Sequence, residues 1–202
     1  MVTFCNDEKP LVLASASPRR KELLESIGIP FIVAPSEVEE AARNGETPEN
    51  HAQRLAEEKA VDVSRVHPGS WVLGADTIVV IDDQVLGKPA DETDAVKMLS
   101  MLAGRKHIVF TGYAILNSMY PDMKTVSYAR SEVFIRELSA AEIAAYIRTR
   151  EPMDKAGAYA IQGVGSAIVG KVCGSYTNVV GLPLYEVTRD LKKLGVYDFL
   201  GV

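Results

Sequence analysis

The sequence has few of the residues that define several large classes of protein. Two cysteines, Cys5 and Cys173, are too few for a disulfide framework, and the three histidines lack the spacing of a zinc site. No apolar run is long enough to span a bilayer. The opening residues, MVTFCNDEKP, lack the charged start and apolar core of a secretory signal. We therefore expect a cytoplasmic protein that does not bind membranes.

Positive charge is also in deficit. The chain has 22 Lys and Arg against 27 Asp and Glu, which gives a formal net charge of −5. A protein that binds nucleic-acid polymers normally carries a basic face, so this balance argues against such a partner. A few local cations can still bind a small anion within an acidic protein.

The order of elements predicts a mixed α/β sheet. The length, 202 residues, is enough for one sizeable core or for one domain divided into two lobes. Apolar runs and turn residues predict strands at 10–16, at 31–34, in 106–117 and in 125–138, and two strands separated by a polar break within 71–89. A tight turn at Asp82 and Asp83 follows the second of these two strands. Capping residues and periodicity predict helices that begin at Pro18, Pro48, about Glu92, after Ser139 and at about 183. Ser139 and Glu142 have the spacing of a capping box.

The stretch SASPRR, residues 15–20, joins the first strand to the first helix. Arg19 and Arg20 lie on the first helical turn, where the backbone already presents positive charge. An oligophosphate held by backbone N–H groups, by Ser15 or Ser17 and by both arginines would explain them. The alternative is a helix capped by Ser17 and Pro18 whose arginines simply point into solvent.

Two further motifs carry groups suited to phosphate chemistry. In GADT, Asp76 and Thr77 are expected where an apolar strand ends, and there Asp76 is suited to hold Mg²⁺ or to accept a proton from water. The alternative is a strand-ending Asp that bonds its own loop. In LGKP, Lys88 lies at a turn, either to neutralise phosphate charge or as an ordinary surface lysine.

Two other charged residues have an open interpretation. Within the acidic run EVEE, Glu40 either joins Asp76 around a hard cation or lies in a solvated loop. Lys59 shares a helix face with Leu55 and Ala56, and either extends to solvent or points into a site.

The last third of the chain is rich in glycine, which lets backbone approach a flat ligand closely. It supplies Asp154, Lys155, Gln162 and Asn178. An amide side chain there is suited to pair with the edge of a base. Without other support, this segment is only a loop-rich β region.

Taken together, the chain resembles the Maf family of nucleoside triphosphate pyrophosphatases from about Leu11 to Leu194. SASPRR, GADTIV, LGKP, EPMDKAGAYAIQG and NVVGLPL occur in the family's order and approximate spacing. The resemblance implies an inosine-triphosphate-pyrophosphatase-like fold, an elongated mixed sheet flanked by helices, with a deep cleft between two lobes. It also implies one domain over residues 10–202, preceded by an extension at 1–9, and a homodimer.

The resemblance further implies hydrolysis of a nucleoside triphosphate to the monophosphate and pyrophosphate, dependent on Mg²⁺ or Mn²⁺. Asp76 would be the catalytic base and would hold the metal with Glu40. Lys59 and Lys88 would handle metal and phosphate. The positions that the family associates with substrate choice match Arg19, Thr77 and Gln162.

Two features point to the family's dTTP/UTP branch, with CTP and modified pyrimidine nucleotides as further candidate substrates. Thr77 follows Asp76, and the later motif reads AYAIQG. The imide edge of thymine or uracil would pair with the Gln162 amide. The alternative substrates are 7-methyl-GTP or non-canonical purine triphosphates. An alternative of another class is a nucleotide-binding regulator of cell division with incidental hydrolysis.

Overall fold

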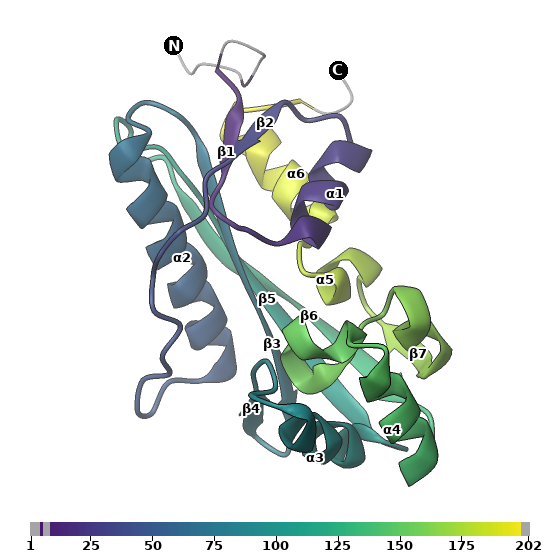
Figure 1. The fold of residues 1–202 in the computed structure, drawn as a ribbon. Coiled ribbons are helices and arrows are strands. Elements are labelled where there is room, and N and C mark those ends of the chain that lie inside the picture. The colour runs from purple at the N-terminus through teal and green to yellow at the C-terminus, as the bar shows by residue number, and fades with distance from the viewer. Residues whose placement is uncertain (1–4, 6–8, 199–202) are drawn as a thin grey trace. The chain divides into compact units, whose positions relative to one another are not determined.

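The computed structural model describes Cys5 and residues 9–198 (Figure 1). This part of the chain contains one seven-stranded sheet in the order β2-β1-β3-β5-β6-β7, with β4 paired to β3. β1 pairs in parallel with β2 and β3, whereas the pairs β3–β4 and β6–β7 are antiparallel. The predicted mixed α/β sheet is therefore confirmed.

The strands are β1 (Leu11–Leu13), β2 (Phe31–Val33), β3 (Val72–Ile81), β4 (Gln84–Leu86), β5 (Lys106–Leu116), β6 (Thr125–Ile135) and β7 (Val169–Cys173). The α-helices are α1 (Pro18–Ser26), α2 (Pro48–Val66), α3 (Glu92–Leu102), α4 (Ala140–Arg148), α5 (Tyr176–Val180) and α6 (Leu184–Lys193). Short 3₁₀ helices cover Glu151–Asp154, Ala156–Ala158 and Gly163–Ala167. Of the helices in these ranges, none has both the length and the apolar character needed to cross a bilayer.

The chain forms two compact units. Unit 1 consists of Met1–Asp76, Thr111–Ala129 and Gly181–Val202, and unit 2 of Thr77–Phe110 and Arg130–Val180. The long strands β3, β5 and β6 each contribute residues to both units. The single domain over residues 10–202 and the deep cleft stay predictions.

Unit 1 has a buried core on each face of its sheet, because side chains alternate along each strand. Leu11 and Leu13 of β1 pack with α1 and α6, together with Leu73, Tyr113 and other residues of the same face. Val12 of β1 faces the other way and packs against α2 with Val72.

Two glycines set the separation between α2 and the sheet. A Cβ atom at Gly74 of β3 would collide with the backbone carbonyl of Ala56, and one at Gly112 of β5 with that of Ala52. Both carbonyls belong to α2, so only residues without a side chain allow the helix to pack this closely. This packing also brings Lys59 of α2 to β3.

Unit 2 has one core, built on residues of β3 to β6 and covered by α3 and α4. It includes Val79, Leu99, Val133 and Ile147. Asp82 and Asp83 both have positive φ, as expected for a two-residue hairpin turn, and join β3 to β4. The predicted tight turn at this pair is confirmed.

Helix starts were predicted well, because capping residues act locally. The Thr47 and Asp91 side chains accept hydrogen bonds from the first turns of α2 and α3. Ser139 and Glu142 form the expected capping box of α4.

The predicted polar break within residues 71–89 is wrong. β3 runs without interruption through Asp76 and Thr77, so Asp76 lies inside the strand and not at its end. A buried carboxylate is tolerated there because the Lys59 ammonium neutralises it.

The expected N-terminal extension lies mostly outside the described residues. Cys5 is described: it is buried in the core of unit 1, and its N–H donates to the Val196 carbonyl at 2.7 Å. Burial raises the pKa of its thiol to about 12, so this cysteine stays protonated.

Candidate functional site

Lys59 joins two carboxylates in unit 1. Its Nζ donates to Asp76 Oδ1 and to Glu40 Oε1, each at 2.6 Å. The Lys59 and Asp76 side chains are each 9% exposed, whereas the Glu40 side chain is 53% exposed. The Lys59 side chain therefore does not extend to solvent, and its part in a site stays a prediction. The two carboxylates predicted to act together, Glu40 and Asp76, do meet at one cation.

Arg20 is the second cation of this cluster. Its Nη1 donates to Ser15 Oγ at 2.9 Å and its Nε to the Gly181 carbonyl at 2.8 Å. Burial lowers the pKa of its guanidinium, and the negative charges of Asp76 and Glu40 oppose that change. Arg20 is therefore held in a fixed orientation within the field of both carboxylates.

The N-terminus of α1 has the geometry that suits an anion. Ser17 is the N-cap and Pro18 the first helical residue, as predicted, but the Ser17 side chain makes no capping hydrogen bond. The first turn contains no acidic residue and carries Arg19 as well as Arg20. Ser15 Oγ also accepts a hydrogen bond from Ser17 N at 3.3 Å, so Ser15 links the end of β1 to this turn.

The loop that carries Glu40 is held on α2 by charged side chains. Arg54 donates to the Ala41 carbonyl at 3.0 Å and to both carboxylate oxygens of Glu46 at 2.7 and 2.8 Å. Asp62 accepts hydrogen bonds from Ser36 Oγ and Glu37 N. These contacts fix the loop on either side of Glu40.

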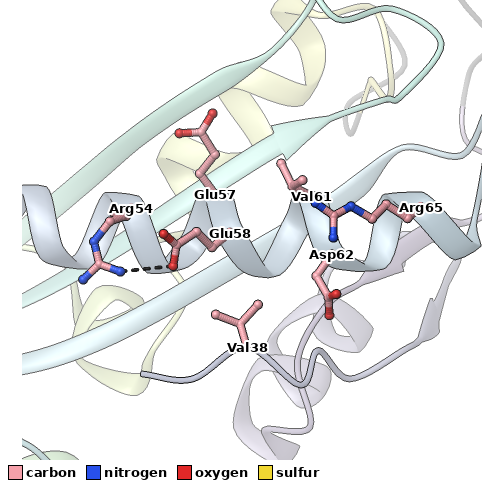
Figure 2. A pocket seen from close by; sticks show the side chains of 7 residues that line it. All are labelled: Val38, Arg54, Glu57, Glu58, Val61, Asp62 and Arg65. Atoms are coloured by element: carbon pink, nitrogen blue, oxygen red, sulfur yellow. Dashed lines mark hydrogen bonds and ion pairs between the residues drawn. The ribbon is translucent and has the colours of Figure 1, made fainter. Parts of the chain in front are cut away.

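A depression lies between α2 and the part of this loop that carries Val38 (Figure 2). Six of its lining residues belong to the helix, Val38 comes from the loop, and Arg54 is ion-paired to Glu58 at 3.0 Å. Its charges are mixed, and none of the predicted site residues lines it. We therefore assign it no part in the site.

Three predicted site residues lie in unit 2. Thr77 is half-buried in β3, and Lys88 is exposed on the loop after β4. The Gly157 N–H donates to the Gly87 carbonyl at 3.0 Å. This bond links the LGKP motif to DKAGAYAIQG, so two motifs that are far apart in sequence lie side by side.

Gln162 is half-buried and lies just before the 3₁₀ helix Gly163–Ala167. The backbone around it is held by Tyr146 and Glu151, which bond Ala160 on one side and Val164 on the other.

Asn178 does not meet the expectation of an amide that is available to a base. It is fully buried, and its Nδ2 donates to the Val109 carbonyl at 3.2 Å and to Ser131 Oγ at 2.9 Å. The amide joins β5, β6 and α5 within unit 2. Lys155 also makes local contacts, to the Glu151 carbonyl and to Asp154, each at 2.6 Å.

Sequence reasoning missed the residues that support the site. Arg54 and Glu46 hold the Glu40 loop, and Tyr146 and Glu151 hold the Gln162 segment. One signal was present, since Glu151 begins the quoted EPMDKAGAYAIQG motif. Nothing in the sequence alone indicated that Arg54 reaches across to the loop.

The carboxylates predicted to hold a metal are Glu40 and Asp76, which both bond Lys59. Over the described residues, no cluster of three or more His, Cys, Asp or Glu side chains has the geometry to bind a metal ion. Glu40 and Asp76 would therefore need ligands from a substrate or from water to complete a metal site.

Solved structures and named relatives both resemble this chain. The Staphylococcus aureus Ham1 protein aligns with a TM-score of 0.42 at 15% identity, over 79% of each chain. A nucleoside-triphosphatase / dITP/XTP pyrophosphatase from Mycobacterium abscessus aligns with a TM-score of 0.40 at 15% identity, over 92% of this chain and 95% of the other.

Sequence similarity is much stronger. A protein of Syntrophus aciditrophicus named dTTP/UTP pyrophosphatase is 48% identical over 95% of this chain and 93% of its own length. A protein of Geobacter metallireducens with the same name is 51% identical over 92% of this chain and 96% of its own length. The model of the family described as Maf-like protein matches residues 10–194, a range that includes every predicted site residue. Such a match over nearly the whole length shows that the chain belongs to the Maf-like protein family.

Proposed function

We propose that this protein hydrolyses dTTP and UTP to the nucleoside monophosphate and pyrophosphate. Relatives with the name dTTP/UTP pyrophosphatase, about half of whose aligned residues are identical, support this substrate class. The observation that carries the proposal is the Lys59 cluster, which collects a buried Asp76, a solvent-accessible Glu40 and the neighbouring Arg20.

The reaction consumes one water molecule. The water oxygen bonds to the α phosphorus, the bond from that phosphorus to the α–β bridging oxygen breaks, and pyrophosphate leaves with the bridging oxygen. Asp76 is placed in this scheme to orient the water and to accept its proton. Its burial and its bond to Lys59 fix the carboxylate, which a general base requires.

The arginines are assigned to the phosphate chain. Negative charge grows on the pyrophosphate as it leaves, and fixed cations stabilise that charge. Arg20 is held by Ser15 and Gly181, so its orientation is established before a nucleotide binds. Arg19 on the same helical turn, the α1 N-terminus and Lys88 would add positive charge.

The donor set of unit 1 fits a divalent metal. Mg²⁺ takes one or two protein carboxylates and completes its shell with phosphate oxygens and water, and Glu40 and Asp76 are two carboxylates directed at one point of positive charge. Mg²⁺ or Mn²⁺ held by them would neutralise phosphate charge and polarise the reacting phosphoryl group.

Base recognition is assigned to Gln162, with Thr77 and Arg19 as further determinants of substrate choice. An amide supplies both a donor and an acceptor, which match the N3–H and carbonyl groups of thymine or uracil. A base with a different pattern would leave buried polar groups unpaired, at roughly 1–3 kcal/mol for each group.

A nucleotide panel tests the proposal. The purified protein is incubated with Mg²⁺ or Mn²⁺ and dTTP, UTP, CTP, dATP, ITP or 7-methyl-GTP, and both products are identified by chromatography. We expect monophosphate and pyrophosphate, released fastest from dTTP and UTP. Preference for 7-methyl-GTP or a purine would contradict the assigned substrates. Tight binding without turnover would favour a nucleotide-binding regulator.

The homodimer that the family resemblance implies stays a proposal with its own test. Sedimentation velocity of the full chain should give twice the monomer mass, and a monomeric species at micromolar concentration would contradict it.

A further inference from the structure

The segment that carries Gln162 has little regular structure of its own. The residues between Ala160 and Gly163 form neither a helix nor a strand, and Gly163 has a φ of +63°. Such a segment orders its side chains poorly unless other groups bond to its backbone.

Two side chains supply those bonds on both sides of Gln162. Tyr146 Oη accepts from Ala160 N at 3.0 Å, two residues before Gln162. Glu151 Oε2 accepts from Val164 N at 2.9 Å, two residues after it, and Oε1 accepts from Gly165 N at 2.8 Å. We refer to Tyr146 and Glu151 as the Tyr–Glu clamp.

The clamp residues are bonded to each other. Tyr146 Oη donates to Glu151 Oε1 at 2.8 Å, and Tyr146 is buried on α4. Arg150, two residues after the end of α4, has a left-handed φ of +64°, and the next residue, Glu151, bonds back to Tyr146 of that helix. The two ends of the Gln162 segment therefore share one hydrogen-bonded unit.

The protonation states of Glu151 and Tyr146 favour the hydrogen bonds of the clamp. Burial raises the pKa of Glu151, but hydrogen bonds from the Gly165 N–H, the Tyr146 hydroxyl and the Val164 N–H outweigh burial and leave that pKa below its usual value. Burial raises the pKa of Tyr146, as does the adjacent Glu151 carboxylate. The clamp is thus an ionised carboxylate and a neutral phenol, which is the pairing that its hydrogen bonds require.

Two glycines show how closely the segment fits the clamp. A Cβ atom on Gly163 would collide with Glu151 Oε2. One on Gly165 would collide with the Ala160 carbonyl and would lie 2.5 Å from Tyr146 Oη. The clamp and the Ala160 carbonyl therefore leave no room for a side chain at either glycine of the IQGVG stretch.

We propose that Tyr146 and Glu151 are positioning residues for base selection, because they fix the backbone from which Gln162 addresses the nucleobase. The inference rests on the proposed role of Gln162. An amide on a mobile segment adapts to several bases, whereas an amide on a fixed segment penalises a mismatched one. Loss of the clamp therefore lowers discrimination between bases more than it lowers turnover.

The test compares kcat/KM for dTTP and dATP in the full-length protein, measured as pyrophosphate release. Tyr146→Phe removes the hydroxyl that bonds Ala160 and Glu151, and Glu151→Gln removes the carboxylate charge. Each should lower the dTTP-to-dATP ratio by about tenfold, equivalent to about 1.4 kcal/mol, with kcat for dTTP changed much less.

Glu142→Gln is the matched control. It weakens the capping box of α4, the helix that carries Tyr146, and leaves the Gln162 segment untouched. Melting curves identify variants that lose stability, and the control should lose stability without a change in the dTTP-to-dATP ratio. If Glu151→Gln does not fold, Tyr146→Phe alone decides the result.

A double variant separates the clamp from Gln162 itself. In a Gln162→Ala background, Glu151→Gln should give no further loss of discrimination, because the amide it positions is absent. If Gln162→Ala lowers the ratio and both clamp variants leave it unchanged, the clamp is only structural and the inference is wrong. If the wild-type protein releases no pyrophosphate from dTTP, the proposed function fails, and the inference fails with it.

Discussion

The two units carry their predicted site residues in different ways. In unit 1, charged side chains from β3, α2, α1 and the loop before α2 converge, and Lys59 and Arg20 compensate Asp76 and Glu40. In unit 2, Gln162 is uncharged and lies on an irregular segment whose backbone is held by Tyr146 and Glu151.

The difference separates two demands on a nucleotide enzyme. Bond cleavage in a phosphate chain needs fixed charge, which regular elements hold best because their backbone is already satisfied. Choice between bases needs hydrogen-bond donors and acceptors that match the edge of one base. A loop can supply them if other groups hold its backbone in place. Variants at Asp76 and Arg20 of unit 1 should therefore change rate, and variants at Gln162 of unit 2 should change preference.

Asp76→Asn should have the largest effect. Asparagine keeps the shape of the side chain but does not accept the proton of the attacking water, so kcat should fall by about 10²–10⁴-fold. The loss should be equal for dTTP and UTP, and nucleotide binding should persist. Stopped-flow pyrophosphate release and equilibrium binding check both statements, and near-normal turnover would remove Asp76 from the mechanism.

Arg20→Ala should have the second-largest effect on activity. It removes a guanidinium that is fixed by Ser15 and Gly181, and charge-assisted hydrogen bonds contribute roughly 1.5–3 kcal/mol each. We expect kcat/KM to fall by about 10–100-fold for every nucleotide in the panel, with base preference unchanged. Arg20→Lys should recover only part of the loss, since it keeps the charge without the planar fork. A change in base preference in Arg20→Ala would contradict the assignment of rate to the charged cluster of unit 1 and of base preference to Gln162.

Gln162→Ala should change preference rather than rate. The ratio of kcat/KM for dTTP to that for dATP should fall by about tenfold, from the loss of roughly 1–3 kcal/mol of matched pairing. Saturating turnover of dTTP should change far less. Steady-state kinetics with both substrates provide the measurement, and an unchanged ratio would show that base choice lies elsewhere.

Glu46→Gln should have the smallest effect, a pH-dependent loss of folded-state stability. Hydrogen bonding from Arg54 lowers the pKa of Glu46 to about 2, below its ordinary value of 4.5. The group therefore stabilises the folded state above pH 4.5, and this contribution is lost as pH falls from about 4.5 towards 2. In urea titrations at pH 6 and pH 3.5, Glu46→Gln should be less stable than wild type at pH 6, and the difference should narrow at pH 3.5. Glu22→Gln, an exposed position on α1, is the control and should follow wild type at both values.

Local chemistry made much of the fold predictable. Thr47, Asp91 and the Ser139–Glu142 pair act within one helical turn, so the sequence alone located the starts of three helices. Apolar spacing placed Lys59 on the buried face of α2. The break expected at Asp76 was wrong because Asp is disfavoured in strands by its local propensity, whereas here a lysine on another element neutralises the carboxylate.

The supporting contacts of the site were not predictable in the same way. Arg54 bonds Glu46 eight residues away, and Tyr146 bonds Ala160 fourteen residues away. In each pair only one residue lies in a helix, so no periodic pattern of one element predicts the contact. The irregular path of each loop decides such contacts, and that path depends on the fold as a whole.

The two glycines beneath α2 extend the site beyond the residues that would touch a nucleotide. Neither Gly74 nor Gly112 carries a reactive group, yet together they set how near the Lys59 ammonium comes to Asp76. Even a single methyl group at either position would act as a spacer under the helix and move the lysine away from its carboxylate. Substitutions at these two glycines should therefore be tolerated as poorly as substitutions at the charged residues, because any side chain would widen the gap between α2 and the sheet.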